Sequence, residues 1–401
     1  MLQKFFAGDA NSPEAVQLAL SAIRKHLNME VAYISEFVGD HSVYQVVDAP
    51  GLEALIKVGD SRSLDEVYCR HILAGRLPEL MPDTAEFDLA ASMPITQAVP
   101  IGAHMSVPIR SAAGDPLGMF CCLSPTPNPS LNARDLQVMR VFADMAAHHI
   151  VSQKTRETEA AAARHRMSQI LETRAFRCVY QPIRNLLTNQ VQGFEALCRF
   201  TTAPGGPDKT FAEAVAVGLG VELEMAVLED ALAVLAHLPD HIYLSVNASP
   251  AVVMSDALPE MFSRFPAGRI VLEITEHASV ACYEELKSAL APIRRAGVRL
   301  AIDDAGAGYA SLQHIITLAP DVIKLDMSLT RAVNMDGARR ALTAALVFFS
   351  QETNSLIIAE GIETEDELHT LRTLGVPLGQ GYLLGRPSPF PDTFHLAEAA
   401  G

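Results

Sequence analysis

The sequence predicts an α/β protein in three parts: an N-terminal α/β domain with an antiparallel sheet, a long helical linker, and a C-terminal (β/α)8 barrel of the TIM type. The chain has 401 residues, which favours two domains over one. Paired apolar segments fill the first part, and short apolar runs alternate with helical stretches in the last. We place the three parts at residues 1–150, 151–172 and 173–401.

Composition and charge exclude several classes of protein. Hydrophobic residues make up 49% of the chain and charged residues 19%, an ordinary globular balance. The net charge of −16 argues against a general DNA or RNA binder, which would present a basic face. No apolar run approaches the ~20 residues of a membrane span, and the N-terminal apolar segment is too short for a secretory signal. The six cysteines show no CxxC pair and no metal-site spacing. We therefore expect a cytoplasmic protein without membrane or polynucleotide partners.

The first part alternates helix and strand signals. Helical apolar spacing covers about residues 12–27. Two strand pairs follow, 31–37 with 42–47 and 105–109 with 116–123, each pair separated by turn residues.

Several segments of this part resemble a GAF domain. That family is a small-molecule or light-sensing module that also serves as a dimerisation scaffold, and the resemblance leaves the ligand open. The segments are Tyr68–Ile72, Gly75–Pro78, Pro82–Asp83, Gly102–Pro108 and Leu117–Leu123.

Cys69 and His71 suggest a chromophore or metal site in this domain. They lie in a helix-like segment, however, where residues two apart face different sides, so we interpret them as structural. The same interpretation applies to His148 and His149, because neighbours on a helix do not face one ligand.

The linker is predicted to be one long helix. Neither proline nor glycine occurs from Leu131 to Leu171, and an apolar stripe that starts at Leu136 gives way to a polar segment over 153–166. Because a helix that is polar in its middle does not bury itself against one domain, we predict a rigid connector that pairs with its copy in a homodimer. The alternative is a solvated single helix between the domains.

The last part contains about eight apolar runs, which fits a (β/α)8 barrel. Helical stretches such as Thr210–His237, Tyr283–Ala296 and Gly337–Glu352 separate most of them, which favours βα units and a parallel sheet. The runs are Cys178–Ile183, Val191–Leu197, Ile242–Asn247, Ile270–Thr275, Val298–Asp303, Val322–Asp326, Leu356–Glu360 and Gly379–Leu384.

Polar residues fall within these runs or at their carboxyl ends. Because those ends form one rim of a barrel, we expect the side chains to meet in one cleft. Oxygen ligands without histidine or cysteine suit Mg²⁺ or Mn²⁺, and so many carboxylates suggest two ions. The residues are Glu195, Asn247, Glu273, Asp303, Asp304, Lys324, Asp326 and Glu360.

Asp303 and Asp304 directly follow an apolar strand signal. Neighbouring strand side chains point to opposite faces, so the two acids share one target only where the strand ends and bends. Unpaired buried carboxylates are costly, and a divalent cation at the strand's end is the simplest explanation. The alternative is a polar turn with Asp304 as a helix N-cap.

The segment Glu195–Arg199 resembles the signature of the EAL domain family, the phosphodiesterases specific for cyclic di-GMP. The supporting motifs occur in family order over about residues 173–398. They are Gln181–Ile183, Leu244–Pro250, Leu272–Glu276, Asp303–Tyr309, Ile323–Asp326, Ala359–Thr364 and Gln380–Tyr382 with Pro387.

The resemblance implies a role for each matching residue. The implied metal ligands are Glu195, Asn247, Glu273, Asp303, Asp304 and Glu360. The implied catalytic residues are Glu195, Lys324, Glu360 and Glu363. The residues implied to contact substrate are Gln181, Arg199 and Gln380. Supporting roles fall to Glu276, which would anchor the loop after Asp304, and Asp326, which would support Lys324.

The expected reaction is hydrolysis of cyclic di-GMP to linear pGpG by a water that two metal ions activate, under control of the GAF-like domain. The usual Phe-Gly after the two aspartates is Ala305-Gly306 here, which would loosen that loop, and Cys198 replaces a leucine with little expected effect. No GGDEF motif occurs, so synthesis of cyclic di-GMP is not expected. Two alternatives are a non-catalytic cyclic di-GMP receptor and an unrelated Mg²⁺-dependent barrel enzyme.

Overall fold

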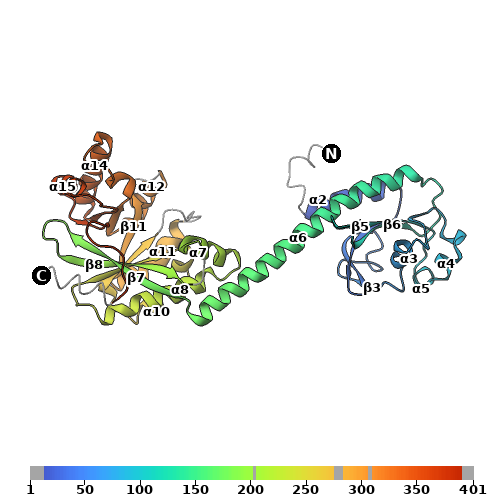
Figure 1. The fold of residues 1–401 in the computed structure, drawn as a ribbon, viewed down its shortest axis with the longest axis horizontal. Helices are drawn as coiled ribbons and strands as arrows, with labels where there is room; N and C mark the ends of the chain where they lie inside the picture. The colour runs from blue at the N-terminus through green and yellow to red at the C-terminus, as the bar shows by residue number, and fades with distance from the viewer. Residues whose placement is uncertain (1–12, 202–204, 275–282, 306–308, 391–401) are drawn as a thin grey trace. The chain divides into compact units, whose positions relative to one another are not determined.

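The computed structural model describes residues 13–201, 205–274, 283–305 and 309–390 (Figure 1). The chain divides into two compact units, Met1–Glu159 and Ala160–Gly401, so the boundary falls within one long helix. No described helix carries an apolar stretch that would span a bilayer.

The N-terminal unit is built on a six-stranded antiparallel sheet in the order β3-β2-β1-β6-β5-β4. Both predicted strand pairs are present, and Gly39, with a φ of 59°, makes the tight turn of the first. The strands are β1 (Val31–Val38), β2 (His41–Asp48), β3 (Ser61–Ser63), β4 (Leu80–Met81), β5 (Ala103–Arg110) and β6 (Pro116–Ser124). The helices are α2 (Pro13–His26), α3 (Cys69–Leu73), η1 (Thr84–Glu86), α4 (Asp88–Ser92), α5 (Pro94–Ala98) and α6 (Ala133–Thr173).

The two faces of this sheet carry separate cores. Phe120 packs with residues of α2 and α6, whereas its neighbours Met119 and Cys121 pack with α3 and the loops on the other face. The alternation follows from the two-residue period of a strand. Cys69 is buried in the second core while His71 is only partly buried, in agreement with the structural interpretation. The side chains of His148 and His149 lie outside the described residues.

Helix α6 has the predicted polar middle. Met139 and Ala143 belong to the core of the N-terminal unit, and Met167 and Ile170 to the core of the C-terminal unit. Residues 155–162 between them are exposed. Pairing of this helix with a second copy remains a prediction.

The C-terminal unit is a closed barrel in the order β10-β11-β12-β13-β14-β7-β8-β9, which confirms the predicted TIM-barrel-like fold. Each predicted apolar run overlaps a strand. The strands are β7 (Phe176–Asn185), β8 (Val191–Phe200), β9 (Tyr243–Ala248), β10 (Ile270–Ile274), β11 (Arg299–Ala305), β12 (Val322–Leu325), β13 (Leu356–Ala359) and β14 (Leu378–Gly379). The helices are α7 (Pro207–Ala216), α8 (Gly220–Ala233), η2 (Val234–Ala236), α9 (Pro250–Val253), α10 (Ala257–Phe262), η3 (Ala267–Arg269), α11 (Tyr283–Arg295), α12 (Tyr309–Leu318), α13 (Met327–Thr330), α14 (Gly337–Thr353) and α15 (Glu365–Thr373).

The sheet departs from the predicted parallel arrangement at β7, which runs antiparallel to both of its neighbours, β8 and β14. The connection over residues 186–190 is too short for a crossover helix, so β7 and β8 form a hairpin. The predicted helix Thr210–His237 is also divided, because Gly218, with a φ of 73°, separates α7 from α8.

The barrel interior is apolar below the rim. Ile183, Tyr243, Val271, Ala301 and Ile358 form part of this inner layer. A larger apolar cluster fills the space between the strands and the surrounding helices. The packed interior leaves the carboxyl ends of the strands as the place where polar side chains gather.

Candidate active site

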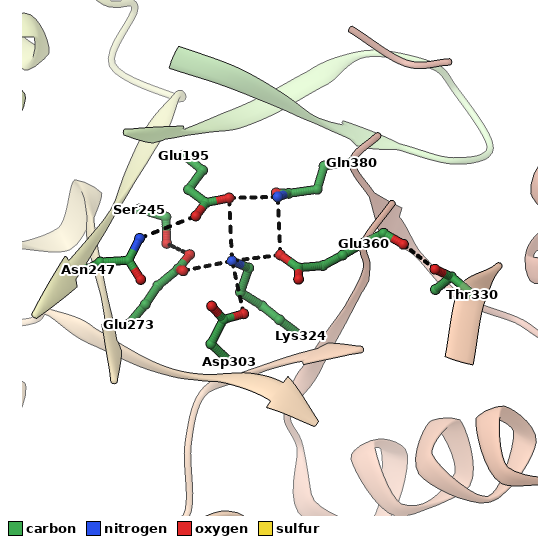
Figure 2. Close-up of polar contacts among 9 residues, drawn as sticks. All are labelled: Glu195, Ser245, Asn247, Glu273, Asp303, Lys324, Thr330, Glu360 and Gln380. Atoms are coloured by element: carbon green, nitrogen blue, oxygen red, sulfur yellow. Dashed lines mark hydrogen bonds and ion pairs between the residues drawn. The ribbon is translucent and has the colours of Figure 1, made fainter. Parts of the chain in front are cut away.

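Lys324 on β12 lies at the centre of four carboxyl groups (Figure 2). Its side chain is only 1% exposed, and its Nζ is 2.7 Å from Oε2 of Glu273 and 2.7 Å from Oε1 of Glu360. The same nitrogen is 3.2 Å from Oδ1 of Asp303 and 3.4 Å from Oε2 of Glu195. Four of these residues lie on strands and Glu360 directly follows β13, so the barrel brings together residues that are distant in the sequence.

The strand register explains the convergence. Glu273 is the parallel partner of Asn247 on β9 and of Ala301 on β11. Strand residues that are two apart share a face, so Asp303 follows Ala301 toward the same rim. Glu273 has no exposed surface, although the four other residues of β10 are apolar. Only the surrounding polar groups compensate for burying its carboxyl group.

The cluster contains more acid than one ammonium group balances. Burial acts to lower the pKa of Lys324, but attraction by Asp303, Glu195, Glu273 and Glu360 raises it well above its usual range. Burial raises the pKa of Glu273 to about 8, against the opposing effect of Lys324. Burial likewise raises the pKa of Glu360 well above its usual range. The cluster therefore favours further positive charge, whether protons or a cation.

Asp303 and Asp304 reach the same place because the strand bends between them. Asp304 has a φ of 56°, and the pairing of β11 with β12 shifts between Ile302 and Ala305. Carboxylate oxygens of Asp303, Asp304 and Glu360 all lie within 4.8 Å of one another. Ala305, the residue after Asp304, still belongs to β11, so Asp304 is not a helix N-cap residue. Oxygen donors at this spacing fit a divalent cation.

Amide and hydroxyl groups hold the carboxylates in place (Figure 2). Nε2 of Gln380 donates to Oε2 of Glu195 over 2.6 Å and to Oε1 of Glu360 over 3.1 Å. Nδ2 of Asn247 donates to Oε1 of Glu195 over 3.2 Å. The hydroxyl group of Ser245 donates to Oε1 of Glu273. Each of these bonds limits the rotation of an acid that faces the cluster.

Comparison with known proteins identifies the barrel. The family model described as EAL domain matches residues 164–387. The chain belongs to the EAL domain family. The model described as GAF domain matches residues 12–150, which confirms the predicted N-terminal domain type.

The EAL domain is similar to named phosphodiesterases. "Probable cyclic di-GMP phosphodiesterase PdeD" from Escherichia coli is 31% identical over 227 residues, which are 54% of this chain and 42% of that protein. The chain spans less than half the length of the curated relatives it matches.

Solved structures share the fold. An EAL domain protein from Listeria monocytogenes is 25% identical with a TM-score of 0.53, and the match covers 58% of this chain and 96% of that one. The PaMucR phosphodiesterase, solved as a c-di-GMP complex, is 28% identical with a TM-score of 0.52, and the match covers 58% and 99% of the two chains.

Two of the predicted EAL-domain residues do not contact Lys324 and have other partners. The carboxylate of Glu363 pairs with Nη2 of Arg331 over 2.6 Å, and 40% of the Glu363 side chain is exposed. Asp326 caps α13, where its side chain accepts from the backbone nitrogen of Ser328 over 2.9 Å. The side chain of Asp326 also lies close to that of Asp304, where it adds to burial and to the charge of Asp303 in raising the pKa of Asp304.

The residues predicted to contact substrate lie on the hairpin strands and after β14. Gln181 is the cross-strand partner of Glu195, and its Nε2 donates to the carbonyl oxygen of Gly385 over 3.2 Å. Nη1 of Arg199 donates to the carbonyl oxygen of Cys198 over 2.7 Å. Glu276 lies outside the described residues, as do residues 306–308 of the loop after Ala305.

Sequence reasoning missed two residues that contact the cluster. Ser245 precedes Asn247 by two positions on β9, and the period of a strand would have placed it on the same face. Thr330 donates its hydroxyl hydrogen to the backbone carbonyl oxygen of Glu360 (Figure 2). No sequence pattern indicates that second contact, because α13 and the end of β13 meet only in the folded barrel.

Proposed function

We propose that this chain hydrolyses cyclic di-GMP to linear pGpG at the cluster around Lys324. One observation carries the proposal: a single ammonium group contacts four carboxyl groups, three on other strands and one directly after β13, at the carboxyl-end rim of an EAL domain. Relatives named as cyclic di-GMP phosphodiesterases support the choice of substrate.

The donor set fits two divalent cations, Mg²⁺ or Mn²⁺. The ligands of one ion would be Glu195, Asn247, Glu273 and Asp303, and those of the second Asp303, Asp304 and Glu360. When bound, such ions lower the pKa of a water molecule and offset the negative charge of a phosphodiester.

The protein's own residues would orient the reactants. The ammonium group of Lys324 stays charged at neutral pH, because its pKa is raised, and it would donate hydrogen bonds to the attacking water. Gln380 would fix the carboxylates of Glu195 and Glu360 through the bonds it already makes. Gln181 and Arg199 would bind the guanine and phosphate groups of the substrate.

Three residues outside the cluster would have further roles. Glu363 would complete the shell of water around the metal ions from the edge of the site, once its ion pair with Arg331 opens. Asp326 would hold the start of α13 and so the end of β12, which carries Lys324. Glu276 would anchor the loop after Asp304.

The alternative function is a receptor that binds cyclic di-GMP without cleaving it. The two functions separate when binding and consumption are measured on one sample of the full chain with Mn²⁺. The proposal predicts that each chain consumes many equivalents of cyclic di-GMP. Binding with no loss of ligand over hours would favour the receptor, and neither binding nor loss would favour a different barrel enzyme.

Metal binding should weaken in acid. Burial, with the nearby charges of Asp303 and Asp326, raises the pKa of Asp304 to about 6. Below that pH the cation has to displace a proton from Asp304 as well as from Glu273 and Glu360, whose pKa values burial also raises. The affinity should therefore fall by at least about tenfold per pH unit. Calorimetric titration of the chain with Mn²⁺ at pH 7, 6 and 5 would measure this. An affinity that does not change over this range would exclude Asp304 as a ligand.

We also propose that the GAF domain regulates the EAL domain through α6, in a homodimer. Proline at the exposed position Ala161 would interrupt the helix. Ala161→Pro should change the turnover of cyclic di-GMP by about fivefold or more, or alter the oligomeric state. Ala161→Ser is the matched control, because it keeps the helix with little loss of propensity. Equal kinetics and equal mass in solution for both variants would contradict coupling through α6.

A further inference from the structure

The GAF domain contains a cavity of about 120 Å³ between the sheet and the segment that carries α3 and α5. Aliphatic side chains, such as Ile101, and three tyrosines, Tyr33, Tyr44 and Tyr68, form most of its wall. The ring centroids of Tyr33 and Tyr44 lie 4.8 Å apart. Protein sites that bind small molecules have this composition, with few polar groups in an apolar wall.

The volume limits what the cavity can hold. An engineered apolar cavity of about 150 Å³ in another protein binds one benzene molecule. A space of about 120 Å³ therefore suits one ring or a short branched chain. A haem, a linear tetrapyrrole or a cyclic nucleotide would require the wall to open.

Two polar side chains in the wall point to the chemistry of the ligand. His104 is 3% exposed, and its Nδ1 has no hydrogen-bond partner among the described residues. Burial lowers the pKa of His104 to about 3, so the imidazole is neutral and adds no charge. Arg62 lies close to Tyr44: burial raises the pKa of Tyr44 to about 12, and the guanidinium group of Arg62 opposes that rise. No described carboxylate forms an ion pair with Arg62.

Among the described residues that line the cavity there is no aspartate or glutamate, and Arg62 is the only one with a permanent charge. We propose that this cavity binds a small carboxylic acid with a single apolar ring or a branched aliphatic chain. The apolar part lies among the tyrosines, and the carboxylate pairs with the guanidinium group of Arg62. Guanidinium and carboxylate groups match in charge and geometry, which makes this pair selective for acids over neutral analogues.

Calorimetric titration of the full chain tests the proposal with defined probes. The acids are benzoate, phenylacetate and 3-methylbutanoate, and each is compared with its alcohol. At least one acid should bind with a Kd below about 1 mM, and its alcohol should bind at least about tenfold more weakly. Arg62→Gln should remove the preference for the acid. Arg110→Gln is the matched control, because this exposed arginine of the same domain donates to the carbonyl oxygen of Gly114 and lies outside the wall.

A second variant tests the location without changing charge. Val99 lines the cavity and is partly exposed, so phenylalanine at this position should fill the space and abolish binding of acid and alcohol alike. Circular dichroism would check that Val99→Phe is folded. The proposal is overturned if none of the acids binds the wild-type chain, if the alcohols bind as well as the acids, or if Arg62→Gln behaves as Arg110→Gln does. No nucleotide enters these titrations, so their outcome is independent of cyclic di-GMP hydrolysis.

Discussion

Lys324→Met is expected to lower the free energy of unfolding of the metal-free EAL domain by about 3–5 kcal/mol at neutral pH, because it leaves buried acids without their partner. The ammonium group contacts four carboxyl groups in a position that is 1% exposed. Methionine fills a similar volume, so the loss arises from charge and not from a cavity. Urea denaturation followed by circular dichroism would measure it on the transition of the barrel.

The pH dependence separates this effect from a general loss of packing. Burial raises the pKa of Glu273 to about 8, so the folded protein holds a proton there that the unfolded chain releases. The contribution of this raised pKa makes the folded state more stable as the pH falls from 8 toward 5. The deficit of Lys324→Met should therefore shrink over that range, because protonated acids no longer need the ammonium group.

Lys287 offers a matched control for this measurement. Its side chain is 42% exposed and lies 3.3 Å from Glu284 on the surface of α11. Lys287→Met should cost less than about 1 kcal/mol at any pH. A Lys324→Met protein as stable as Lys287→Met would contradict the assignment of Lys324 as the compensating charge.

Asp303→Asn should reduce the turnover of cyclic di-GMP by about 10³-fold or more while leaving the fold intact. Asp303 contacts Lys324 and also lies within reach of Asp304 and Glu360, so it belongs to both proposed groups of metal ligands. Asparagine keeps the shape of the side chain but removes its charge and one oxygen ligand. Steady-state kinetics at saturating substrate would give kcat for each protein.

Asp240→Asn is the matched control for Asp303→Asn. Asp240 is fully exposed, and its carboxylate is 3.6 Å from Nη1 of Arg269, away from the cluster. Its loss should leave kcat unchanged. Turnover in Asp303→Asn within about tenfold of the wild type would exclude a central role for Asp303.

The sequence was sufficient to predict the gathering of the acids. Glu273, Asp303 and Glu360 each stand within or just after a short apolar run, and barrel geometry brings such positions to one rim. The sequence also predicts that the strand bends at Asp304, because the side chains of two adjacent strand residues otherwise point to opposite faces. Its left-handed φ of 56° is the local cause.

Other features depend on tertiary contacts that a pattern of residue types does not encode. The direction of β7 is one, because the apolar run of an antiparallel strand looks the same as that of a parallel one once both faces are buried. The pairing of Glu363 with Arg331 is another, since α13 brings Arg331 near only after folding. The volume of the GAF-domain cavity likewise follows from how its loops pack.

The most direct test of the central claim is the identity of the product formed in water enriched in oxygen-18. The purified chain would be incubated with cyclic di-GMP and Mn²⁺, and a control would contain a chelator. The nucleotides would be separated by chromatography and their masses measured by mass spectrometry. Hydrolysis by a water at this cluster predicts linear pGpG with one oxygen-18 atom in its terminal phosphate, and no product with the chelator. Unconsumed cyclic di-GMP, or a product without the label, would contradict the account.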